Sequence, residues 1–180
     1  MCTIQGLSAS QVCGEADGGV KACYVAEFAN LSFTIGSKKV TAITGALKKF
    51  VFTKNNTAFF NSTGERQTLS VHRYQQEGLM QFNQTDAATE AADEIKACCK
   101  LVPIWLLENG NIRIQGVQFT SSAKTALEVS AVECRAIASD LSDVGGQESR
   151  VEIKFTSQSK NTVIVNTASI NEAYLDALVA

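Results

Sequence analysis

Three consecutive stretches decide the fold predicted for this chain: residues 68–82 (TLSVHRYQQEGLMQF), 85–101 (TDAATEAADEIKACCKL) and 103–114 (PIWLLENGNIRI). The first alternates its side chains with period two, which is typical of a β-strand. The second carries apolar residues at helical spacing behind a group of carboxylates, which suits a helix and its dipole. The third is a hairpin with Asn109-Gly110 at its tip, the usual pair of a two-residue type I′ turn. This order of elements predicts a mainly β (α+β) fold.

Shorter β patterns lie on both sides of these stretches. Before them we expect strands at Val20–Phe28, Leu31–Ile35, Val40–Thr44 and Lys49–Thr53. After them, residues 127–138 hold one strand or two, residues 150–156 form another with Val151, Ile153 and Phe155 inward, and Ser169-Ile170-Asn171-Glu172 is a capping box for a final helix. In the 103–114 hairpin, a two-residue turn places Trp105, Leu107, Ile112 and Ile114 on one core-facing side.

The chain has 180 residues, of which 45% are hydrophobic. These values suit one domain, residues 1–180, with a real core. The predicted architecture is an antiparallel β-sandwich or half-barrel with one flanking helix and a short C-terminal helix. A loose N-terminal arm, about residues 1–19, and a projecting loop or long hairpin, about residues 53–67, complete it.

The middle of the long strand is polar on both faces. It contains His72, Arg73, Tyr74, Gln75, Gln76 and Glu77. A sandwich strand normally keeps one apolar face, so these six residues are candidates for the rim or wall of a water-filled barrel, or for an exposed edge. Gly78 is expected to mark a bend or bulge.

Two adjacent aromatic residues, Phe59 and Phe60, stand in a polar, Asn-rich segment that also contains Asn55 and Asn56. Such a pair either folds back onto the core or waits for a partner subunit. These four residues are the candidate subunit interface.

No pattern of catalytic or ligand-binding residues is present. His72 is the only histidine, and Ser70 lies two residues before it on the same strand face. A catalytic Ser-His dyad would also need an orienting carboxylate and an oxyanion hole, and the sequence shows no pattern for either. No glycine-rich phosphate loop and no metal-ligand spacing occurs. We therefore expect no enzyme, no cofactor and no metal site.

The charge and the cysteines of the chain give no sign of tight nucleic-acid binding or of a disulfide framework. The net charge of -2 gives no general attraction to nucleic acid. The N-terminus lacks a signal peptide, and no apolar run is long enough for a membrane helix. The six cysteines are therefore expected to be free thiols in a chain made in the cytoplasm.

The order of elements resembles a known family. A short arm precedes Gly18-Gly19-Val20-Lys21-Ala22-Cys23-Tyr24-Val25-Ala26, short strands end in Phe50-Val51-Phe52, and a projecting loop, a long polar strand, one helix and a hairpin follow. This resembles the tail tube (major tail) proteins of tailed bacteriophages, especially those of phages of Bacteroidetes hosts.

The resemblance implies a structural virion protein that self-assembles into stacked hexameric rings. Each subunit gives strands to a continuous inner barrel, and phage DNA passes through the tube. The implied partners are further copies, other virion proteins and duplex DNA as non-specific cargo, with no membrane, in the virion and in the host cytoplasm during assembly. Arg73 departs from this expectation, because fixed cations in a DNA channel would hold phosphates. The alternative is a capsid decoration or head-tail connector protein with a related β-sandwich, and a thiol-dependent enzyme is the third reading.

Overall fold

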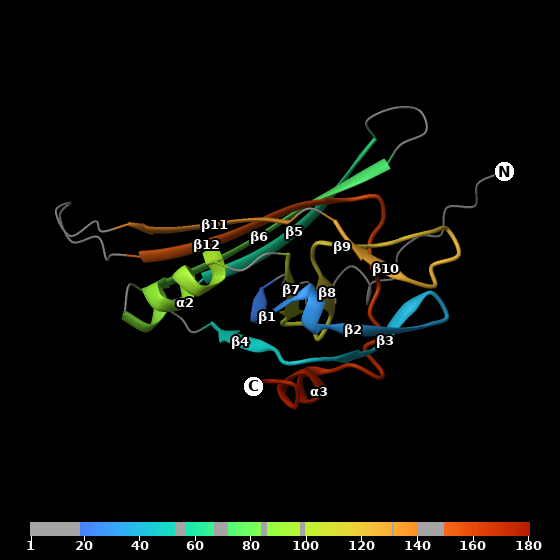
Figure 1. Ribbon diagram of the computed structural model, residues 1–180, viewed down its shortest axis with the longest axis horizontal. Helices are drawn as coiled ribbons and strands as arrows, with labels where there is room; N and C mark the ends of the chain where they lie inside the picture. Colours follow the sequence, from blue (N-terminus) through green and yellow to red (C-terminus); the bar gives the residue numbers. More distant parts are fainter. Residues whose placement is uncertain are drawn as a thin grey trace, which may run out of the picture.

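The computed structural model describes residues 19–52, 57–66, 72–83, 86–97, 100–130, 132–139 and 150–180 (Figure 1). Its elements in chain order are β1 (Val20–Glu27), the 3-10 helix η1 (Phe28–Asn30), β2 (Ser32–Gly36), β3 (Lys39–Thr44), β4 (Lys48–Val51), β5 (Thr57–Arg66), β6 (His72–Asn83), α2 (Asp86–Ala97), β7 (Leu101–Leu107), β8 (Ile112–Ile114), β9 (Val117–Phe119), β10 (Leu127–Val129), β11 (Val132–Ser139), β12 (Arg150–Ser159) and α3 (Glu172–Asp176). The predicted mainly β fold with one flanking helix and a short C-terminal helix is confirmed. The predicted arm lies outside the described residues, except for Gly19.

Two antiparallel sheets of four strands face each other. The central sheet has the order β4-β1-β7-β8, and the long sheet has the order β11-β12-β6-β5. In Figure 1 the long sheet forms the upper layer, the central sheet lies beneath it, and α3 lies at the bottom. The pairs β2-β3 and β9-β10 form two smaller sheets.

Apolar side chains pack on both faces of the central sheet. The core between the two large sheets includes Cys23, Met80, Ala92, Ile95, Trp105, Val151, Ile153 and Phe155. The core on the opposite face includes Tyr24, Val40, Ile43, Ile104, Ile112, Ile114, Ile170 and Leu175. A strand that is buried on both faces needs an apolar side chain at nearly every position, which explains the sequence LVPIWLL of β7.

The β7–β8 hairpin has a different turn from the predicted one. Leu106 pairs with Ile112. The Leu107 N–H donates to the Asn111 carbonyl at 2.9 Å, so the loop has three residues, and Gly110 within it has a left-handed φ of 78°. The predicted two-residue turn is therefore wrong. The additional residue shifts the register by one and moves the tryptophan to the face toward the long sheet.

Strand β6 pairs on both sides. It pairs with β12 from Tyr74 to Asn83 and with β5 from His72 to Gln81, without a register shift in either pairing. The alternative of an exposed edge position is therefore wrong, and the strand has no bulge at Gly78. A Cβ placed on Gly78 would lie 2.1 Å from Trp105 Cζ2, so the glycine makes room for the indole ring.

Three predicted boundaries also change. The sequence predicts a projecting loop or a long hairpin at about residues 53–67. Residues 57–66 instead form strand β5, which is one strand of a hairpin with β6. Helix α2 ends at Ala97, and Leu101 already begins β7. The N-cap of α3 is Asn171, whose side chain accepts the Tyr174 N–H at 2.9 Å, and not the serine of the predicted capping box.

Candidate functional site

The inner face of β6 is polar because it contributes to a buried hydrogen-bond network. Gln76 is buried, and its Oε1 accepts the Gly116 N–H at 3.2 Å and the Ser157 hydroxyl at 3.1 Å. Gln115 is also buried, and its Oε1 accepts the Trp105 Nε1–H at 2.9 Å. The Gln115 amide in turn donates to backbone carbonyls of β6 and β12. Both side-chain oxygens and the Gln115 amide nitrogen thus have partners, as buried polar groups require.

This network shows in which direction some of the candidate wall residues point. Gln76 faces the interior of the subunit and cannot line a lumen. Tyr74 lies on the same side of the strand and is half-buried. The backbone of His72 belongs to β6, but its side chain lies outside the described residues.

The outer face of the long sheet is polar and exposed to solvent. Among the side chains that the structure describes, this face contains by register Asn61, Thr63, Arg73, Gln75, Glu77, Gln81, Glu133, Arg135, Arg150, Glu152, Lys154, Thr156 and Gln158, with the apolar residues Phe59 and Leu79. None of these side chains is buried. Arg73, Gln75 and Glu77 of the predicted wall residues therefore share this face.

Cations and carboxylates are similar in number among the described residues of this face: Arg73, Arg135, Arg150 and Lys154 stand against Glu77, Glu133 and Glu152. Lys154 Nζ lies 2.6 Å from Glu77 Oε1. The Arg73 guanidinium donates to Gln158 at 3.4 Å, and on the next row the Gln81 amide donates to Glu152 at 2.9 Å. Such exposed pairs contribute little stability, but they reduce the positive potential that a phosphate backbone would meet.

Both edges of the long sheet are open in the described part of the chain. Strand β5 forms one edge and β11 the other, and neither pairs with a further described strand. The β5 residues from Asn61 to Gly64 are all exposed. The sequence alone does not predict that these residues form a sheet edge. The alternation of the polar residues Glu152, Lys154 and Thr156 with apolar ones in β12 was the sequence pattern that indicated a solvent-exposed face of the sheet.

The two aromatic residues of the candidate interface separate. Phe60 points inward and stacks on Trp105 with ring centroids 5.8 Å apart. Phe59 points outward on the edge strand and is 41% exposed. Asn55 and Asn56 lie outside the described residues. Phe60 therefore folds back onto the core, whereas an interface role for Phe59 stays a prediction.

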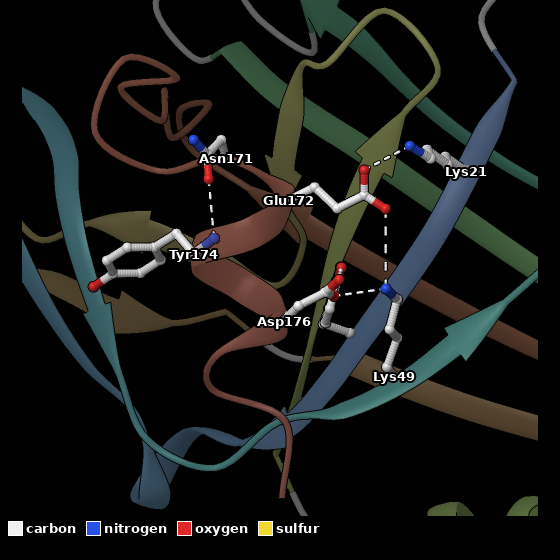
Figure 2. A network of polar contacts seen from close by, with 7 residues as sticks. Lys21, Lys49, Asn171, Glu172, Tyr174 and Asp176 are labelled. Atoms are coloured by element: carbon white, nitrogen blue, oxygen red, sulfur yellow. Dashed lines mark hydrogen bonds and ion pairs between the residues drawn. The ribbon is translucent and has the colours of Figure 1, made fainter.

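A second polar cluster fixes α3 to the central sheet (Figure 2). Lys49 Nζ lies 2.6 Å from Asp176 Oδ1, and the Tyr24 hydroxyl donates to the same oxygen at 2.6 Å. Lys21 pairs with Glu172. The Lys49 ammonium, and after it the Tyr24 hydroxyl, lower the pKa of the Asp176 carboxyl, whereas burial and then this hydrogen bond raise the pKa of Tyr24. The cluster positions a helix and gathers no nucleophile with a base.

Within the described residues, no group of three or more His, Cys, Asp or Glu side chains is placed to hold a metal ion. A search of the same residues for a helix long and apolar enough to span a membrane finds none. Cys23 is buried and Cys134 is half-buried, and both are thiols that form no disulfide bond. Burial raises the pKa of the Cys23 thiol, which is the opposite of what a nucleophile needs.

The arrangement therefore offers a polar sheet face and two open strand edges, which suit assembly better than chemistry. No family model, no curated protein and no solved structure matches this chain.

Proposed function

We propose that this chain is a structural virion protein that assembles into stacked hexameric rings and forms a tail tube through which phage DNA passes. The long sheet is the observation that carries the proposal. Its outer face is polar and exposed, and its edges β5 and β11 pair with no further described strand. Long open edges pair with another chain unless something blocks them.

The strand directions support closure into a ring. Each neighbouring pair in the order β11-β12-β6-β5 is antiparallel, so β5 and β11 run in opposite directions. When copies are related by rotation about one axis, the β5 edge of one copy meets the β11 edge of the next. These two edges then meet antiparallel, and the sheet continues around the ring without a change of pattern.

The dimensions suit a duplex. Six four-stranded sheets, with strands about 4.8 Å apart and tilted by about 40°, close into a barrel about 48 Å across between backbones. Side chains that project about 5 Å from each wall leave an opening of about 38 Å. The outer face would then line the opening, and its three described carboxylates offset most of the attraction that its four described cations would have for phosphates.

Electron microscopy of the purified protein tests this directly. We expect rings or tubes with an open centre. Phe59→Lys places a charge on the exposed β5 edge and should prevent ring formation while circular dichroism stays unchanged. Val51→Lys is the matched control, because Val51 is 55% exposed on another strand, β4, and should leave rings intact.

Three outcomes would count against the tube. Rings that form equally well from Phe59→Lys would remove the β5 edge from the contact. A closed ring centre, or a wild-type protein that never assembles, would favour the decoration or connector role. Tight, salt-sensitive duplex binding by the unassembled subunit would reject a passive conduit, because each phosphate contact adds about 0.9 to the salt slope.

A further inference from the structure

A groove with a volume of about 530 Å³ opens between α2, β4 and the end of β1. Its apolar lining includes Val25, Phe50, Ile95 and Leu101. This groove lies between α2 and the central sheet, at the margin of the core between the two large sheets, to which Val25, Ile95 and Leu101 belong. Apolar grooves of this size commonly receive a partner.

The two rims of the groove differ in charge. Glu94 and Glu27 line the side formed by α2 and β1, and Glu94 is exposed without an ion pair among the described residues. On the β4 side, Lys49 is bound to Asp176 at 2.6 Å, and Lys48 donates to the Ala180 carbonyl at 3.2 Å. The basic rim is thus occupied within the chain, whereas the acidic rim can receive a cation.

A basic turn lies at the other end of the molecule. Ser37 and Lys38, with φ of 51° and 63°, form the turn between β2 and β3, and Lys38 and Lys39 are both exposed. In the described part of the chain neither lysine has an ion pair. Figure 1 shows the β2–β3 hairpin and α2 at opposite ends of the longest axis.

We propose that the β2–β3 turn of a second copy docks in this groove. The aliphatic stems of Lys38 and Lys39 lie along the apolar floor, and their ammonium groups pair with Glu94 and Glu27 at the rim. Because groove and turn are different patches at opposite ends of one subunit, the contact is head-to-tail and repeats in one direction. The inference rests on the proposed tube and names the contact by which its rings stack.

Two complementary charge reversals test the contact. Lys38→Glu/Lys39→Glu makes the turn acidic, and Glu27→Lys/Glu94→Lys makes the acidic rim basic. Each variant alone then brings like charges together at the contact. Its rings should stack only at a roughly tenfold higher protein concentration than wild-type rings, as measured by sedimentation and electron microscopy. An equimolar mixture should stack as the wild type does, because each turn then meets a groove of opposite charge. Lys124→Glu/Lys160→Glu has the same net charge as the first variant and should stack normally.

Carbodiimide cross-linking identifies the occupant of the groove. Wild-type protein mixed with its ¹⁵N-labelled form should yield Lys38–Glu94 or Lys39–Glu94 cross-links between light and heavy chains. Single variants that stack normally, a mixture that fails to recover, or cross-links from another segment would each overturn this contact while leaving the tube intact. Wild-type protein that never assembles would overturn the tube and the stacking contact together.

Discussion

Gly78→Ala tests the contact between the two large sheets most sharply. The added methyl group would lie 2.1 Å from Trp105 Cζ2, 2.7 Å from Cε2 and 2.8 Å from Gln115 Oε1. Unstrained carbon contacts lie at about 3.5–4.0 Å, so the indole must move by more than about 1 Å. It has little room, because Trp105 is buried and contacts the rings of Phe60 and Phe155.

The expected cost follows from these contacts. Overpacking of a core costs about 1–3 kcal/mol, and loss of the Trp105–Gln115 hydrogen bond leaves buried polar atoms unpaired at a cost of about 1–3 kcal/mol. The lower entropy of an unfolded alanine offsets about 0.4–1 kcal/mol. We therefore expect Gly78→Ala to lower the free energy of unfolding by about 1–5.5 kcal/mol.

Urea unfolding followed by tryptophan fluorescence measures this change at the site itself, because the chain has one tryptophan. Gly64→Ala is the matched control: its methyl group would meet only the ring edge of half-buried Tyr74, at 3.1 Å. A loss below about 1 kcal/mol for Gly78→Ala, or equal losses for both variants, would show that the indole does not lie against this strand. Trp105→Leu combined with Gly78→Ala should show strong non-additivity.

Three further predictions concern other parts of the molecule. Phe60→Ser should cost about 3–5 kcal/mol of stability because it empties a site beside Trp105, whereas Phe59→Ser should leave the urea midpoint within experimental error and weaken ring formation, as seen by sedimentation. The pKa of Asp176 is lowered in the folded state, so its charged form stabilises the fold above the unfolded pKa near 4, and this stability is lost as the pH falls through the folded pKa. The difference in urea midpoint between wild type and Asp176→Asn should therefore disappear between about pH 5 and pH 2. A difference that persists at about pH 2 would contradict the ion pair. All six cysteines should react with a thiol reagent in denaturant without reductant, and an intact mass lower by pairs of hydrogens would show disulfides instead.

The sequence predicts best those elements whose environment follows from local pattern alone. The alternation of β12 correctly places Val151, Ile153 and Phe155 inward, because this strand has one apolar and one solvated face. The helical spacing of apolar residues predicted within 85–101 is correct for a similar reason, because Ala92 and Ile95 of α2 are both buried in the core. Asn109-Gly110 fits both a two-residue and a three-residue loop, and the packing of the tryptophan between sheets decides between them.

The candidate site is harder to predict because its determinants are distant in sequence. Gln76 can be buried only because Ser157 and Gly116 supply its partners from other strands. Strand β5 escapes recognition because Asn61 and Gly64 have low β propensity, and pairing with β6 overrides that preference. Which strands become edges depends on sheet order, which period-two patterns do not encode.

The position of β1 and β7 between two cores has a consequence for local opening. Their amides become accessible to solvent only when packing on both faces is broken, so they should exchange hydrogen at the rate of global unfolding. The exposed end of the β5–β6 hairpin has no such cover on Asn61 to Gly64 and should exchange through small fluctuations. The chain thus combines a slow-exchanging centre with a fast-exchanging edge, so that a neighbour could order the edge without disturbing the packing that maintains the fold.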